Sequence, residues 1–146
     1  MTFPLGANLF DRAAVWSPPP WMTSQGHPYT RLRRVLEMRS SASLIRAAAA
    51  ELPSVPLEEA LDICLALLEL EPESYPRIAT RWASRLAIER KLDLVDAQLA
   101  FAALAALPGP GVRAGAEALI EISTRYSLRR GAELLSAWLD RRGLTD

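Results

Sequence analysis

The sequence predicts an all-α protein of stacked antiparallel helix pairs, either a short α-solenoid or an irregular helical bundle, with an extended N-terminal arm. From Tyr29 almost to the end of the chain, apolar residues recur at i, i+3 and i+4, and no segment alternates apolar and polar residues as a strand would. In addition, SVPLEEALDICLALLEL at 54–70 and KLDLVDAQLAFAALAAL at 91–107 have the same length and nearly the same apolar pattern. We therefore expect residues 1–28 to form the arm and residues 29–146 to form one helical domain.

Length and composition agree with a single globular domain. The chain has 146 residues, of which half are apolar and 23% are charged, so it can form a hydrophobic core. Its formal charge is zero, so it lacks the overall positive field that draws proteins to nucleic acid or anionic lipid. The single cysteine, the lack of a long apolar run and the lack of a signal-peptide pattern favour a cytoplasmic protein that does not enter a membrane.

The first 28 residues differ in composition from the rest of the chain. They contain five of the 11 prolines and two of the four tryptophans, Trp16 and Trp21, which flank the sequence SPPP. Consecutive prolines fix φ and remove hydrogen-bond donors, so we expect an extended segment here rather than a long helix. The segment is too apolar for a solvated tail. We expect it to cover its own helices; the alternative is docking on another chain, with Trp16 and Trp21 as candidate partner-binding residues.

Start and stop signals divide the remaining residues into seven helical segments. The segments at 54–70 and 74–90 each begin with serine and carry proline in the first turn, where the missing amide hydrogen is tolerated, and Ser74 is a candidate cap. Asp93 is expected to cap the helix that follows it, and the sequence PGPG at 108–111 predicts a turn. The expected segments are 30–39, 41–52, 54–70, 74–90, 93–107, 112–126 and 127–142.

A weak internal repeat runs through these segments. Aligning Leu57 with Leu94 and Leu128 brings together small residues three positions later, and then apolar residues seven and ten positions later. A helix pair repeated at 34 to 37 residues is typical of stacked α-hairpins. Residues 40–142 therefore resemble the HEAT, armadillo and tetratricopeptide group of helical repeats in period and apolar pattern; the alternative is a bundle in which the alignment is accidental. The repeat predicts that all three leucines are buried, and that the small residues Ala60, Ala97 and Gly131 face a neighbouring helix.

Few side chains in the sequence could perform catalysis or bind a metal. His27 is the only histidine and Cys64 is the only cysteine, and Cys64 lies on an apolar helix face where a thiol packs as a small hydrophobic group. Glu58, Glu59 and Asp62 are interpreted as a solvated acidic first turn that suits the helix dipole, because no Glu-x-x-His motif is available to complete a di-iron site. We therefore expect no cofactor, no metal and no enzymatic activity.

Arginines form one conspicuous series. Arg77, Arg81 and Arg85 stand at i, i+4 and i+8, as a stripe on one helix face would require. Glu73 and Glu89 extend the series by one step at each end, so we interpret it as a ladder of solvated ion pairs, each worth a few tenths of a kcal/mol.

These observations favour a non-catalytic protein–protein interaction or adaptor module whose partner is another protein. The alternative is a nucleic-acid- or anion-binding protein that uses an Arg-rich helical surface; nucleic acid is not favoured because the net charge is zero. Binding through phosphate contacts would depend steeply on salt, whereas binding through apolar surface would depend on salt less strongly. The candidate partner-binding residues outside the arm are Arg31, Arg34, Arg77, Arg81 and Arg85.

Overall fold

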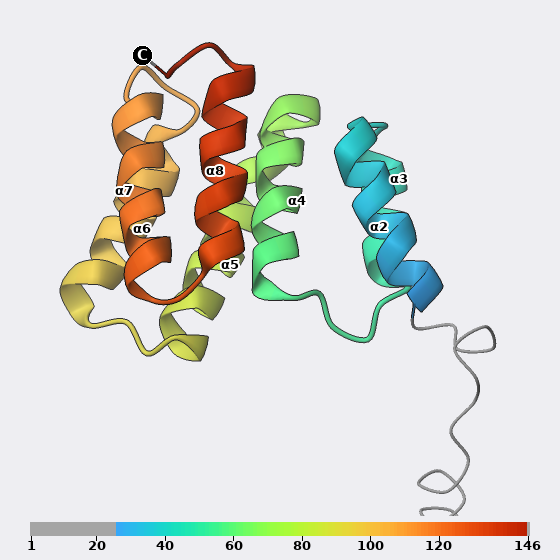
Figure 1. Cartoon of the computed structure of the whole chain (residues 1–146), viewed down its shortest axis with the longest axis horizontal. Coiled ribbons are helices and arrows are strands. Elements are labelled where there is room, and N and C mark those ends of the chain that lie inside the picture. Colours follow the sequence, from blue (N-terminus) through green and yellow to red (C-terminus); the bar gives the residue numbers. More distant parts are fainter. Residues whose placement is uncertain (1–25, 146) are drawn as a thin grey trace, which may run out of the picture.

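The computed structural model describes residues 26–145, and every regular element in that range is helical (Figure 1). The predicted all-α class is therefore confirmed. Trp16, Trp21 and most of the expected arm lie outside the described residues. The helices are α2 Gly26–Met38, α3 Ala42–Ala50, α4 Leu57–Leu70, α5 Tyr75–Glu89, α6 Leu94–Ala106, α7 Val112–Arg125 and α8 Arg129–Arg141, with a 3-10 turn at Pro72–Ser74.

The helix starts follow the predicted signals in part. Asp93 caps α6, because its Oδ1 atom accepts a hydrogen bond from the amide of Asp96 at 2.7 Å. The prediction that Ser74 caps α5 is wrong: the 3-10 turn leads directly into the helix, and the Ser74 hydroxyl donates to Glu71 Oε2 at 2.6 Å instead. Helix α2 begins at Gly26 rather than at Tyr29.

Four helices end in the same left-handed turn. Arg39, Lys91, Ser127 and Gly143 have φ values of 46°, 54°, 63° and 67°, and they follow α2, α5, α7 and α8. In each turn the next residue donates its amide to the carbonyl five positions earlier, for example Leu128 to Ser123 at 2.7 Å. This bond satisfies a carbonyl that the end of a helix leaves free. Only one of the four positions is glycine, so the other three accept an unfavourable backbone conformation.

Helices α4 to α8 form a closed ring. Each helix contacts the next along the chain, and α8 returns to pack beside α4, as Figure 1 shows. In an open solenoid, the last helix of such a series would lie far from the first. Of the two architectures that the sequence allowed, residues 57–141 thus adopt the irregular bundle. The resemblance to the helical repeat families stays a prediction.

Buried aromatic residues hold the ring together, and each satisfies its polar atom. Trp82 Nε1 donates to the carbonyl of Leu57 at 2.8 Å, and the Tyr75 hydroxyl donates to the carbonyl of Leu104 at 2.6 Å. Trp138 Nε1 donates to Glu69 Oε1 at 2.8 Å across the contact between α8 and α4. A buried Trp or Tyr therefore contributes its apolar area without leaving a donor unpaired.

The α2–α3 hairpin packs on α4 and on no other helix of the ring. Its contact is a separate small core made of Leu32, Leu36, Ile45 and Ala48, which meet Ala66 of α4. Helix α4 thus lies between the hairpin on one side and the other helices of the ring on the other side (Figure 1).

The predicted repeat register is wrong in α6. Leu57 and Leu128 are buried, but Leu94 is 74% exposed, and Phe101, which the alignment also placed in the core, is 40% exposed. The buried positions of α4 recur in α6 two residues later than expected, so that the place of Leu57 is occupied by Asp96 rather than by Leu94. The residues of α6 are apolar on nearly all sides of the helix. The sequence therefore has no polar face that would identify which side is buried. Ala60 and Ala97 are half-buried and Gly131 is buried, so none of the three small residues lies on open surface.

Candidate functional site

The structure separates the arginines that the sequence grouped together. Arg31 forms an ion pair with Glu51 at 2.5 Å, and Arg34 lies exposed on the outer side of α2. The other three lie on α5, which does not contact α2. A continuous Arg-rich surface that joins the two sets is therefore not formed by the described helices.

The expected ion-pair ladder on α5 forms only at its last step. Arg85 Nε donates to Glu89 Oε1 at 3.0 Å. Glu73 makes no ion pair with Arg77, and within the described residues neither Arg77 nor Arg81 has an acidic partner. The interpretation of the series as a compensated ladder is therefore wrong for these two arginines.

Arg77 and Arg81 line a groove of about 420 Å³ between α3 and α5. Arg46 reaches the same groove from α3. Its guanidinium forms an ion pair with Glu71, which follows the end of α4. Arg46 and the Ser74 hydroxyl both donate to Glu71 and lower the pKa of its carboxyl, so Glu71 is ionised at neutral pH. The groove was not visible in the sequence, because Arg46 meets the α5 arginines only through the packing of the hairpin on α4. The remaining lining residues are Glu73, Ser74 and Ile78.

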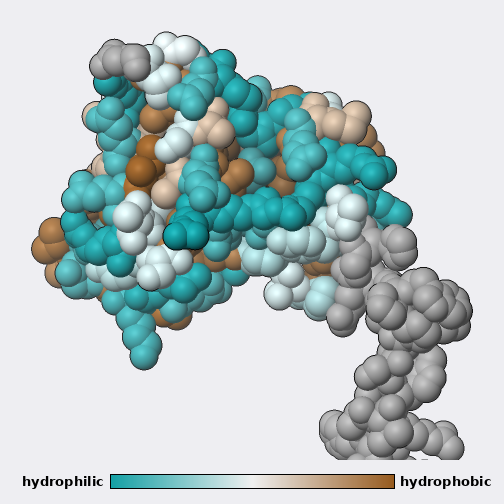
Figure 2. Space-filling model, in the orientation of Figure 1, coloured by the Kyte–Doolittle hydropathy of each residue, from teal (hydrophilic) through white to brown (hydrophobic). Residues whose placement is uncertain are grey.

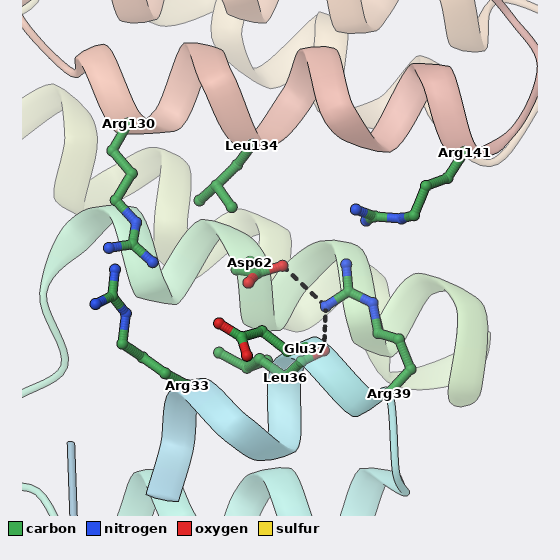
Figure 3. A pocket seen from close by; sticks show the side chains of 8 residues that line it. All are labelled: Arg33, Leu36, Glu37, Arg39, Asp62, Arg130, Leu134 and Arg141. Atoms are coloured by element: carbon green, nitrogen blue, oxygen red, sulfur yellow. Dashed lines mark hydrogen bonds and ion pairs between the residues drawn. The ribbon is translucent and has the colours of Figure 1, made fainter. Parts of the chain in front are cut away.

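A second charged cavity, of about 210 Å³, lies between α2 and α8 and is also lined by α4 (Figure 3). Arg33 and Arg130 point toward one another across one end of it, as Figure 3 shows, and Arg39 lies at the other end. The sequence did not indicate that arginines of α8, Arg130 and Arg141, would line a charged cavity. The lining residues are Arg33, Leu36, Glu37 and Arg39 of α2, Asp62 of α4, and Arg130, Leu134 and Arg141 of α8.

The acidic residues of α4 are not the solvated first turn that we expected. Glu59 is only 3% exposed, and it accepts a hydrogen bond from the Tyr29 hydroxyl at 2.7 Å and an ion pair from Arg130 at 3.3 Å. Asp62 accepts from Arg39 at 2.8 Å. Glu59 Oε1 thus joins Tyr29 of α2 to Arg130 of α8, and Asp62 adds Arg39 of α2, so this cavity is best explained as the charged joint that holds the hairpin on the ring.

The outward face of α6 is apolar, and none of the other helices in the described part of the chain packs on it. Leu94 and Val95 are 74% and 70% exposed, and Leu99 and Phe101 are 39% and 40% exposed. The helix contains two polar residues, of which Asp96 is buried, so Gln98 is the only polar side chain on this face. Figure 2 shows hydrophobic surface at the edge of the molecule where α6 begins. We call the residues Leu94, Val95, Gln98, Leu99, Phe101, Ala102 and Ala105 the α6 face.

An apolar groove of about 450 Å³ adjoins the α6 face. It lies between the first half of α5 and the second half of α6, and Phe101 forms part of both the groove and the face. Its lining contains no charged residue. The lining residues are Tyr75, Pro76, Ala79, Thr80, Phe101, Leu104, Ala105 and Pro108.

Asp96 fixes the start of α6 against the end of α7. Its carboxylate accepts hydrogen bonds from the Tyr126 hydroxyl at 2.5 Å and from Arg125 at 2.7 Å. These two bonds lower the pKa of Asp96 below its ordinary range, since both stabilise the charged form. Because the buried side of α6 is anchored in this way, Leu94 and Val95 are directed outward.

The described residues contain no arrangement typical of catalysis. Cys64 is buried in the core as predicted, and desolvation raises the pKa of its thiol to about 12, so it is not a nucleophile at neutral pH. No three His, Cys, Asp or Glu side chains within residues 26–145 are grouped so that they could hold a metal ion. None of the described helices is both long enough and apolar enough to cross a bilayer.

Comparisons with protein-family models, with curated proteins and with solved structures find no match to this chain. The geometry of the described residues is therefore the basis for assigning a function.

Proposed function

We propose that this protein is a non-catalytic protein-interaction module, and that the α6 face is the surface that docks its partner. One observation carries the proposal: the four large apolar side chains of α6, from Leu94 to Phe101, are exposed together on a face that has no charged residue. Single exposed apolar residues are common, but a contiguous apolar patch on a small domain is typical of an interaction site. The predicted cytoplasmic location is retained as part of the proposal.

The expected occupant is the apolar side of a helix that belongs to another protein. Large side chains alternate with Ala102 and Ala105 on the α6 face, which gives the ridges and hollows into which a second helix packs. The adjoining groove can accept one projecting apolar side chain from the same helix. The lack of charge on the face requires a matching uncharged surface on the partner.

The energy available from this face is of the size that binding requires. Full burial of a Val or Leu side chain contributes roughly 1.5–3 kcal/mol. Covering the exposed parts of Leu94 and Val95, which are 74% and 70% exposed, would contribute about 2–4 kcal/mol. Leu99, Phe101 and the groove add to this sum, so the face can offset a substantial part of the entropy lost on association.

The proposal is tested by comparing capture of partners by three forms of the chain from the cells that produce it. The forms are the parent, Val95→Glu and a matched control, Met38→Glu, which changes a side chain of similar exposure (68%) on α2. Both substitutions alter exposed positions, so both variants should fold as the parent does. A partner that docks on α6 should be lost from Val95→Glu and kept by Met38→Glu, because the glutamate buries a charge in an apolar contact. Equal recovery on the two variants would contradict the proposal.

A further inference from the structure

We propose that the groove between α3 and α5 binds a single phosphate group, either as the free ion or as the phosphate monoester of a small ligand. Arg77 and Arg81 would provide the main contacts and Arg46 a third. This binding site is separate from the α6 face and goes beyond the protein-docking role proposed above.

Arg77 and Arg81 have no acidic partner among the described residues, as is also true of Arg34 and Arg129, but they share one groove with a third arginine, Arg46. Arginine and glutamate four residues apart are paired in some helices of this protein and unpaired in others, such as Arg33 with Glu37 and Arg129 with Glu133. Glu73 stands at this spacing from Arg77, and the two are not paired. The pairs that do form are Arg85 with Glu89, Arg113 with Glu117, and Arg125 with Glu121.

Arg46 is held in position for a ligand. Its ion pair with Glu71 fixes one edge of the guanidinium, and Glu71 is fixed in turn by the Ser74 hydroxyl at 2.6 Å. A guanidinium has five N–H donors, so the ion pair leaves others free. Orientation before binding lowers the entropy that a ligand contact would otherwise cost.

The arrangement of the arginines suits a tetrahedral oxyanion. Arg77 and Arg81 are four residues apart on α5, which places their attachment points about 6 Å apart along the helix axis. Guanidinium groups bind phosphate oxygens through paired, charge-assisted hydrogen bonds, which are stronger than neutral ones.

The charge of the groove suits one phosphate rather than a polyanion. Three arginines and Glu73 line it, and Glu71 neutralises part of the charge of Arg46, so a small positive excess remains. Tight nucleic-acid binding uses several phosphate contacts spread along a basic surface, and Arg31 and Arg34 are too remote to extend this one. Glu73 opposes an anion, so its removal should strengthen binding.

The test is a titration of the full chain with sodium phosphate at pH 7.5. The sodium chloride concentration is lowered as phosphate is added, so that the ionic strength stays constant. NMR signals of the arginine Nε–H groups report the binding. Saturable shifts confined to Arg46, Arg77 and Arg81 are expected, with phenyl phosphate producing the same shifts if a monoester is accepted. Arg77→Gln and Arg81→Gln should each weaken binding about ten-fold or more, because each removes a charge-assisted contact. Glu73→Gln should strengthen binding, and the matched control Arg129→Gln, an exposed arginine of α8, should leave it unchanged.

Three results would overturn the proposal. Shifts that do not saturate, or that chloride alone reproduces, would show general ion screening rather than a site. An effect of Arg129→Gln equal to that of Arg77→Gln would show that net charge, not the groove, controls binding. Tighter binding of a short single-stranded oligonucleotide, with shifts that extend to Arg31 and Arg34, would identify a nucleic-acid surface instead. None of these results bears on the α6 face, which the Val95→Glu comparison tests by itself.

Discussion

Replacing Gly115 with alanine should destabilise the protein, although alanine normally stabilises a helix. Gly115 lies in α7 where that helix meets α6. A Cβ atom there would lie 2.6 Å from the carbonyl oxygen of Ala103 and 3.1 Å from the Cβ of Ala106. The nearer obstacle is backbone, so it cannot rotate away, and α7 would have to shift away from α6.

The net effect follows from two opposing terms. Glycine to alanine in a helix interior contributes up to about 1 kcal/mol of stability. Overpacking a tight contact costs about 1–3 kcal/mol, and a backbone obstacle favours the upper part of that range. We therefore expect Gly115→Ala to lower the free energy of unfolding by about 1–2 kcal/mol, which urea titration followed by circular dichroism at 222 nm would measure.

Gly131 provides the matched control. It is also a buried helical glycine, but a Cβ there would meet its nearest atoms at 3.4, 3.5 and 3.6 Å, which is ordinary van der Waals contact. Gly131→Ala should therefore be neutral or stabilising by up to about 1 kcal/mol. If Gly115→Ala proved at least as stable as Gly131→Ala, the close approach of α6 and α7 would be refuted.

Three further predictions concern single side chains. Cys64 should react with a thiol reagent slowly in the native protein and rapidly in denaturant, and fast native labelling would contradict its burial. Asp96→Asn should lower the free energy of unfolding at pH 7. Because the folded-state pKa of Asp96 is depressed, the stability that its carboxylate contributes is present above about pH 4 and disappears as the pH falls below that value. The unfolding curves of parent and variant should therefore converge in acid. Lys91→Gly should raise the melting temperature, because glycine adopts the φ of 54° at the end of α5 without strain, and an unchanged or lower value would argue against the left-handed turn.

Local signals in the sequence predicted most of the helices. Asp93 and the proline-glycine turn at 108–111 mark the ends of α6 as the structure has them, and the apolar face around Cys64 is buried as expected. These features depend on residues close together in the sequence. The register of α6 could not be predicted in the same way, because its apolar residues satisfy several registers equally, and Asp96 selects one of them through Arg125 and Tyr126.

The candidate sites depend on contacts between distant segments, which explains why the sequence showed them poorly. In the sequence, Glu59 is indistinguishable from a solvated residue at the start of a helix. Its burial depends on Tyr29, which is 30 positions away in the sequence and contacts Glu59 only in the fold. Likewise, Arg46 and Arg77 share a groove only because the hairpin packs on α4. Arg77 and Arg81 were identified from their spacing, but their unpaired state could be read only from the structure.

Site-specific photo-crosslinking tests the central claim, that the α6 face docks a partner, most directly. A photoreactive amino acid would replace Leu94 in one form of the chain and Met38 in another, two positions that are 74% and 68% exposed. The account predicts an adduct with one particular protein from position 94, mapped to an apolar helix of that protein, and no such adduct from position 38. Adducts at both positions alike, none at position 94, or a dimer of this chain as the sole product would contradict it.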